Sequence, residues 1–239
     1  MMYRILPVVL FFMMSFSITN IKTESPEPNK QLTTAELAPT FEENVASVYA
    51  QLQSNNLALP KLESFSQALE GFYEMKEKGV VTKDILTLID FSLSSNTKRL
   101  WIIDLSTNTI LYNSLVAHGR NTGNEFAKSF SNAAESYKSS LGFYATGEVY
   151  YGKHGRSLRL DGLEKGVNSN ARNRAVVMHG ADYVSESFIK NNSRLGRSLG
   201  CPAIPVELTD EIINTIKDKS LLFIYHPSRD NKAKTAQVS

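Results

Sequence analysis

Short apolar segments separated by turn residues dominate the chain from residue 84 onward. They are rich in Ile, Leu, Val and aromatic residues and comprise DILTLIDFSL (84–93), KRLWIIDLS (98–106), TILYNSLVAHG (109–119), GFYATGEVYYG (142–152), SLRL (157–160), AVVMHG (175–180) and LLFIYH (221–226). Ser106-Thr107-Asn108 between the second and third segments is typical of a hairpin connection. This pattern predicts a mainly β domain, a sandwich or a barrel, with helices over 183–191 and 207–219.

Two helices are predicted before this domain. Thr40 and Glu43 have the spacing of a capping box. Apolar residues follow at helical spacing, namely Phe41, Val45, Val48, Tyr49 and Leu52. Pro60 begins a second helix and Gly79 ends it. We therefore expect a helical hairpin over residues 39–80, packed against a domain over 81–228, and a polar tail over 229–239.

The first residues predict export. Arg4 precedes an apolar run over 5–14, and Ser15 and Ser17 stand where a signal peptidase requires small residues. The run is shorter than the roughly 20 residues of a membrane-spanning helix, so we expect a cleaved signal peptide over 1–20 and no stable membrane insertion after cleavage. A retained membrane anchor is the alternative. Residues 21–38 are polar and contain prolines, which favours a disordered linker. The periplasm is the expected location.

Composition excludes some partners. The net charge is +2 and the basic residues are spread along the chain, whereas a nucleic-acid surface needs clustered Lys and Arg. One cysteine and widely spaced histidines lack the paired spacings of zinc sites. We therefore expect no nucleic acid, metal or cofactor.

The segment GRSLGCPAIP (196–205) holds the only cysteine, Cys201, and two overlapping motifs. Gly196–Gly200 fits the G-x-S-x-G pattern of serine hydrolases, which needs a strand before the serine and a helix after it. The preceding KNNSRLGR is polar and the following CPAIP contains two prolines, so this context is missing. The alternative is a cysteine nucleophile at Cys201, although a free cysteine can also be a buried structural residue.

A thiol nucleophile needs a base and an oxyanion site. His118 and His179 each follow an apolar, strand-like run and precede a glycine, whose carbonyl is accessible to orient the ring, while His154 is expected in a loop. Taken singly, each histidine also fits a structural role. Gly200 lacks a Cβ, so the N–H groups of residues 199–201 are candidate oxyanion donors.

At HGADYVSESFIKNNSRLGRSLGCPAIP (179–205) the chain resembles the L,D-transpeptidase catalytic-domain family of bacterial cell-wall enzymes. The usual family pattern is His-Gly, a gap, then Ser-His-Gly-Cys and a basic residue. The resemblance is to a divergent branch and extends over 84–226, through VAHGRNTGNEFAKSFSN (116–132), SSLGFYATGEVYYGKHGRSLRLDGLEKG (139–166) and RAVVMHGADYVS (174–185). It implies a mixed β-sandwich with flanking helices.

The resemblance also implies roles for individual residues. Cys201 is the implied nucleophile and His179 the base, oriented by the carbonyl of Gly180. Ser198 braces the loop, and the backbone from Leu199 to Cys201 supplies oxyanion donors. The implied substrate is a peptidoglycan stem tetrapeptide, which loses D-alanine and is then crosslinked to a neighbouring amine. Carbapenem β-lactams are the implied inhibitors.

The chain departs from the family pattern at two positions. Leu199 replaces the histidine before Gly-Cys, so any role of that imidazole is absent or falls to His118. The arginine that usually follows the cysteine is missing, and Arg197, Arg174 and Arg120 are the candidate replacements, with Arg197 first. These departures leave two alternatives open: an L,D-carboxypeptidase, in which water resolves the thioester, and a catalytically silent wall-binding module.

Overall fold

The computed structural model describes residues 40–229, which belong to one compact unit. Three predicted segments lie outside these residues: the signal peptide (1–20), the linker (21–38), and all but the first residue of the tail. Within the described part of the chain, no helix is long and apolar enough to cross a membrane.

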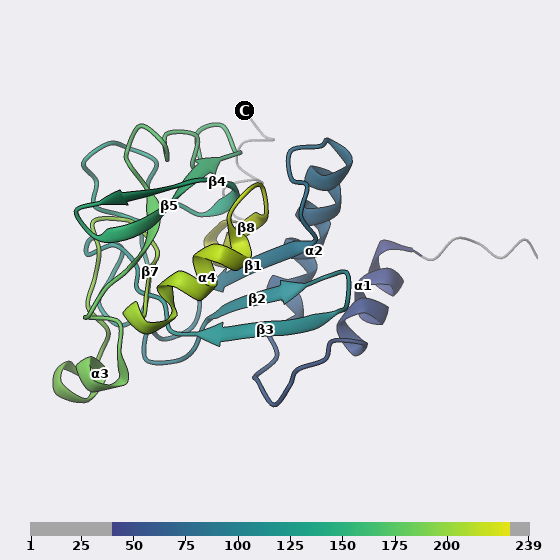
Figure 1. Ribbon diagram of the computed structural model, residues 1–239, viewed down its shortest axis with the longest axis horizontal. Coiled ribbons are helices and arrows are strands. Elements are labelled where there is room, and N and C mark those ends of the chain that lie inside the picture. Colours follow the sequence, from purple (N-terminus) through teal and green to yellow (C-terminus); the bar gives the residue numbers. More distant parts are fainter. Residues whose placement is uncertain (1–39, 230–239) are drawn as a thin grey trace, which may run out of the picture. The chain divides into compact units, whose positions relative to one another are not determined.

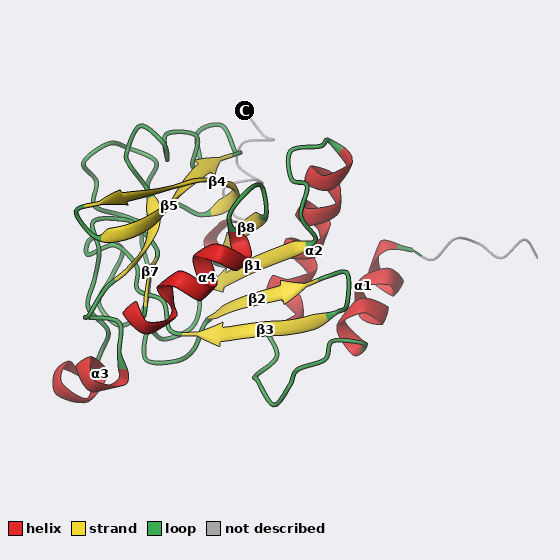
Figure 2. Ribbon diagram, viewed as in Figure 1, coloured by secondary structure: helices red, strands yellow, loops and turns green. Residues whose placement is uncertain are grey.

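Within residues 40–229, eight strands form a single mixed sheet in the order β3-β2-β1-β8-β4-β5-β6-β7. The strands are β1 (Ile85–Asp90), β2 (Leu100–Asp104), β3 (Thr109–Ser114), β4 (Gly142–Gly152), β5 (Gly155–Gly162), β6 (Val177–Gly180), β7 (Ala203–Ile204) and β8 (Leu221–Tyr225). β1 pairs with β8 and β6 with β7 in parallel, and the other neighbours are antiparallel. The predicted mainly β class with flanking helices is confirmed (Figure 2).

The helices lie on both faces of the sheet. They are α1 (Phe41–Ala50), α2 (Leu62–Glu77), α3 (Glu186–Asn192) and α4 (Thr209–Ile216), with one 3₁₀ turn, η1 (Val206–Leu208). The Thr40–Glu43 capping box is present at the start of α1. α2 ends before Gly79, whose φ of +66° suits glycine. Tyr49 of α1 packs on Phe65 of α2 with ring centroids 5.4 Å apart, so the two helices contact each other.

Alternation along the strands divides the core between the two faces. In β8, Leu221 and Phe223 face the cluster that includes α1 and α2, whereas Leu222 and Ile224 face the cluster that includes α4. α2 and α4 accordingly cover opposite faces of the central strands (Figure 1). Each fully buried aliphatic side chain of this kind contributes about 1.5–3 kcal/mol by leaving water. This packed centre supports the shorter strands β6 and β7 at one end of the sheet.

Candidate active site

The loop that leads to Cys201 is closed by the hydroxyl of Ser198. This Oγ donates to the carbonyl of Cys201 at 2.6 Å and accepts the N–H of Gly200 at 3.0 Å. Ser198 is buried and no helix follows it directly, so the strand–turn–helix context of a nucleophilic serine is absent. The side chain acts instead as a brace across the loop.

Gly200 permits the close approach of two neighbouring segments. Its φ is +127°, and a Cβ at this position would lie 2.9 Å from the carbonyl oxygen of Lys138 and 3.3 Å from a guanidinium nitrogen of Arg174. Its N–H is occupied by Ser198, so it is not a free oxyanion donor in this structure. The N–H groups of Leu199 and Cys201 make no hydrogen bond within residues 40–229, which leaves them for an incoming oxygen.

A second segment, residues 118–120, holds the loop in place. The N–H of Ser198 donates to the carbonyl of His118 at 3.0 Å, and the N–H of Arg120 donates to the carbonyl of Ser198 at 2.8 Å. The hydroxyl of Ser139 links the two segments, since it accepts from Gly119 N–H and donates to the Gly200 carbonyl. The His118-Gly119 pair that the sequence singled out therefore supports the cysteine loop through its backbone.

Cys201 lies half-buried against the start of β6. Its Sγ accepts the N–H of Val177 at 3.5 Å and donates to the carbonyl of Ala175 at 3.7 Å. Burial raises the pKa of the thiol, while the Val177 N–H and the charge of Arg174 act in the opposite direction. At neutral pH the sulfur is therefore a thiol, and it needs a base to become a nucleophile.

His179 is placed two residues further along β6. The residue is 2% exposed, and Nδ1 donates to the carbonyl of Gly180 at 2.9 Å, which leaves Nε2 as the basic nitrogen. Burial and, to a smaller extent, the nearby His154 lower its pKa, so the imidazole is neutral at pH 7. β6 pairs with β7 so that His179 lies opposite Ala203, and the segment that carries Cys201 directly precedes β7.

The sequence analysis missed the contribution of His154. This residue occupies the turn between β4 and β5, and its ring stacks on that of His179 with centroids 4.4 Å apart and an angle of 21°. The turn is distant in sequence, so only the pairing of β5 with β6 reveals this contact. His154 covers one face of the imidazole and thereby contributes to its burial.

The ring of His118 is engaged in buried hydrogen bonds. The side chain is buried, accepts a hydrogen bond from Arg99 at 2.8 Å through Nδ1, and contacts the carbonyl of Gly123 through Nε2 at 3.2 Å. Burial and the Arg99 charge lower its pKa to about 4. The imidazole is therefore neutral and fully engaged, and it does not replace the histidine that Leu199 displaces; the Leu199 side chain is exposed.

The three candidate arginines have different surroundings. Arg174 lies beside Gly200 and lowers the pKa of Cys201, and its guanidinium donates to four oxygens of residues 131–140. Arg197, the first choice from sequence, donates instead to Asn124 at 2.7 Å and to nearby carbonyls. Arg120 stacks on Tyr137 at 4.2 Å. Of the three, only Arg174 acts electrostatically on the sulfur.

Comparison of the sequence with known protein families decides the family of this chain. A sequence profile described as "L,D-transpeptidase catalytic domain" matches residues 58–225. The chain belongs to the L,D-transpeptidase catalytic-domain family. The matched range includes α2, residues 118–120, the loop that leads to Cys201, and β6, which carries His179. No curated protein sequence matches the chain significantly.

Solved structures of the family are similar to the chain at low identity. An L,D-transpeptidase from Mycobacterium smegmatis is 9% identical with a TM-score of 0.37. This match covers 60% of the present chain and 59% of the M. smegmatis chain. The L,D-transpeptidase LdtMt1 in complex with imipenem is 9% identical with a TM-score of 0.37. This match covers 59% of the present chain and 59% of the LdtMt1 chain. The helical cell shape determining protein Pgp2 (K307A mutant) from Campylobacter jejuni is 14% identical with a TM-score of 0.41. This match covers 65% of the present chain and 53% of the Pgp2 chain. The chain thus covers less than two thirds of each of these proteins.

Arg174→Ala is expected to raise the pKa of the Cys201 thiol, because the charge that favours the thiolate is removed. The rate of alkylation by iodoacetamide at pH 8 should fall about three- to tenfold, which corresponds to roughly half to one pKa unit. The pH profile of alkylation measures this shift. Arg197→Ala is the matched control and should leave the profile unchanged, since its guanidinium bonds to the segment around Asn124. If Arg174→Ala also kept the wild-type pH profile, Arg174 would not act on the Cys201 thiol.

Proposed function

We propose that the protein is an exported, cysteine-dependent L,D-transpeptidase that acts on peptidoglycan stem tetrapeptides. The observation that carries this proposal is the placement of the Cys201 sulfur against β6, the strand that contains His179. The Cys201 sulfur is hydrogen-bonded to the backbone of β6, and the same strand fixes His179 with Nδ1 on Gly180 and Nε2 unprotonated. A wall-binding module needs neither group, so this arrangement disfavours a silent domain.

In the first half-reaction, Nε2 of His179 accepts the thiol proton and Sγ attacks the carbonyl carbon that precedes the terminal D-alanine. The oxygen becomes negatively charged and receives hydrogen bonds from the N–H groups of Leu199 and Cys201. One such donor contributes about 3 kcal/mol to an acyl-transfer transition state. The C–N bond then breaks, His179 returns the proton to the departing amine, and a thioester and free D-alanine remain.

In the second half-reaction, an amine of a neighbouring stem attacks the thioester carbon. Its proton passes to His179, the C–S bond breaks, and the sulfur leaves as a thiolate that regains the proton. The products are an amide crosslink and the starting enzyme. Water in place of the amine gives a tripeptide, which is the carboxypeptidase alternative.

Mass spectrometry of purified muropeptides incubated with the enzyme tests the proposal. Conversion of tetrapeptide to crosslinked dimer with release of D-alanine is the expected result. Conversion to tripeptide alone would identify a carboxypeptidase. An unchanged tetrapeptide would refute both enzyme activities and favour the wall-binding alternative.

Imipenem is expected to acylate Cys201, because its strained ring amide presents a carbonyl to the same N–H groups as the substrate does. A solved complex of the L,D-transpeptidase LdtMt1 with imipenem makes this class of inhibitor the appropriate probe. Intact-mass spectrometry should show one adduct on the wild-type protein and none on Cys201→Ala. An adduct that persists in Cys201→Ala would contradict the assignment of the nucleophile.

A further inference from the structure

The proposed oxyanion donors, the N–H groups of Leu199 and Cys201, belong to two separate peptide units. In a trans peptide the N–H of one residue points opposite to the carbonyl of the residue before it. All peptide bonds within residues 40–229 are trans. The Ser198 carbonyl therefore sets the direction of the Leu199 N–H, and the Gly200 carbonyl sets the direction of the Cys201 N–H.

Both of these carbonyls are held by one neighbouring segment. The N–H of Arg120 donates to the Ser198 carbonyl at 2.8 Å. The hydroxyl of Ser139 donates to the Gly200 carbonyl at 3.1 Å and accepts the N–H of Gly119 at 3.0 Å. The two carbonyls thus face the segment of Gly119 and Arg120, so the two donor N–H groups are turned to the other side of the loop.

The peptide unit between Gly200 and Cys201 needs an external partner to keep its orientation. A glycine has the widest choice of backbone conformations, so the peptide unit that follows it rotates at low cost. The Ser198 hydroxyl bonds to the Gly200 N–H and the Cys201 carbonyl, which belong to the units before and after this one. Among residues 40–229, only the Ser139 hydroxyl holds the unit between them.

The Ser139 hydroxyl is itself confined to one orientation. The residue is 1% exposed, and both Gly119 and Gly200 are buried. Its backbone is fixed because its N–H donates to Oγ1 of Thr122 at 2.8 Å and its carbonyl accepts the N–H of Ser131 at 3.1 Å. The Gly119 N–H occupies the hydroxyl oxygen as a donor, which leaves the hydroxyl proton for the Gly200 carbonyl.

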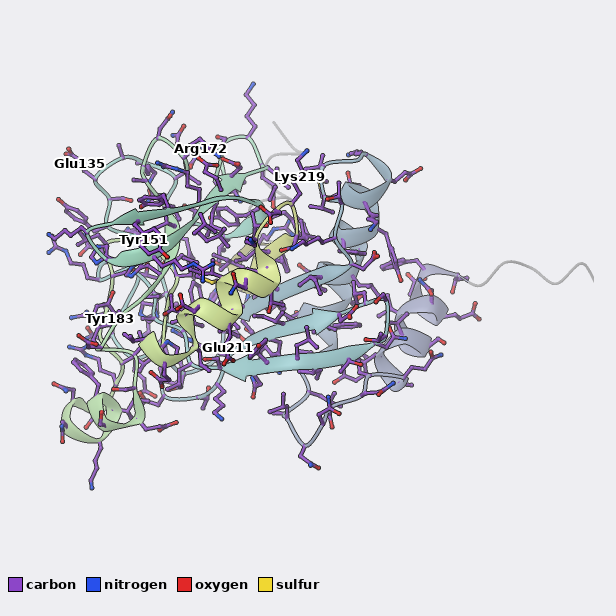
Figure 3. The ribbon with its side chains drawn as sticks, viewed as in Figure 1. Glu135, Tyr151, Arg172, Tyr183, Glu211 and Lys219 are labelled. Atoms are coloured by element: carbon purple, nitrogen blue, oxygen red, sulfur yellow. The ribbon has the colours of Figure 1, made fainter. Side chains whose placement is uncertain are left out.

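We propose that Ser139 is a positioning residue of the oxyanion site, whose hydroxyl fixes the Gly200–Cys201 peptide and so directs the Cys201 N–H at the developing oxyanion. The inference rests on the proposed function and specifies how its acylation step is stabilised. Ser139 lies 61 residues before Gly200, in the same loop as Glu135, on the side of the molecule away from α1 and α2 (Figure 3). A donor that is directed in advance needs no reorganisation when the charge develops.

The decisive experiment compares two reactions of the same sulfur. Acylation of Cys201 by imipenem passes through an oxyanion, whereas alkylation by iodoacetamide displaces iodide from a saturated carbon and forms none. Intact-mass time courses give both rates. Ser139→Ala should lower the acylation rate about ten- to a hundredfold, since one donor is misdirected rather than removed, and should leave the alkylation rate unchanged. The release of D-alanine from tetrapeptide should fall by the same factor as the acylation rate.

Two further variants complete the comparison. Ser64→Ala is the matched control, because Ser64 is equally buried and its hydroxyl also donates to a backbone carbonyl, that of Lys61, but in α2. It should keep the wild-type ratio of acylation to alkylation. Thr122→Val removes the hydroxyl that accepts the Ser139 N–H, so it should lower this ratio by a smaller factor, and it decides the question if Ser139→Ala does not fold.

A wild-type ratio in Ser139→Ala would overturn the inference. An equal loss of both rates would also overturn it, because Ser139 would then support the fold of the loop without directing a donor. A wild-type enzyme that releases no D-alanine would refute the proposed function, and the imipenem rates would still decide the role of Ser139. A wild-type enzyme inert toward tetrapeptide and imipenem alike would refute the proposed function and this inference together.

Discussion

Cys201→Ala is expected to reduce the release of D-alanine from stem tetrapeptide by at least roughly 10³-fold, because no other nucleophile can form the acyl intermediate. Cys201 is the only cysteine of the chain, and its Sγ is the group held against β6 beside His179. Chromatographic measurement of D-alanine gives the rate. The variant should still fold, since the side-chain contacts of the sulfur are long and weak.

Ser198→Ala is the control for the nucleophile assignment. It removes the hydroxyl that joins the Gly200 N–H to the Cys201 carbonyl, so it should destabilise the loop by about 1–3 kcal/mol and reduce the rate less than Cys201→Ala does. An inactive Ser198→Ala together with an active Cys201→Ala would restore the serine-hydrolase interpretation of the G-x-S-x-G motif.

His179→Gln should reduce turnover about 10²- to 10⁴-fold, the usual contribution of a general base. Glutamine cannot accept the thiol proton, so alkylation of Cys201 by iodoacetamide near pH 7 should also slow. In the wild-type enzyme the pKa of His179 is lowered by burial, so the unprotonated base persists below pH 6.5. The acidic limb of the kcat/KM profile should accordingly lie below pH 6.5.

His118→Gln distinguishes the base from a structural histidine. His118 is buried and bonded to Arg99 and Gly123, so its replacement should lower the melting temperature. The pH profile of Cys201 alkylation should stay as in the wild type. A change of that profile in His118→Gln and none in His179→Gln would show that the base had been assigned to the wrong residue.

Local sequence patterns were sufficient for most of the elements of secondary structure. The capping box at Thr40, the positive φ of Gly79 and the hairpin between β2 and β3 each depend on residues a few positions apart. The continuous apolar run of LLFIYH likewise identified β8 before any partner strand was known, because both faces of this strand are buried in apolar clusters. The candidate nucleophile and base were found because their motifs are contiguous.

The two-residue strand β7 escaped sequence analysis, because CPAIP carries no strand pattern of its own. Its conformation is decided by pairing with β6 and by contact with Ala117, both distant in sequence. Contacts that are distant in sequence also decide which of Arg174 and Arg197 acts on the Cys201 sulfur. Proximity to Cys201 in sequence favoured Arg197, but its guanidinium is directed toward Asn124 by the segment that follows His118.

The sequence by itself thus determined the chemistry that is present: one thiol, a histidine before a glycine at a strand end, and a glycine before the cysteine. Only the tertiary structure decided how these groups are surrounded. It directed the Ser198 hydroxyl to the N–H of Gly200 and stacked His154 on His179. The physical reason is that pairing between β5, β6 and β7 joins segments whose separation along the chain carries no local signal.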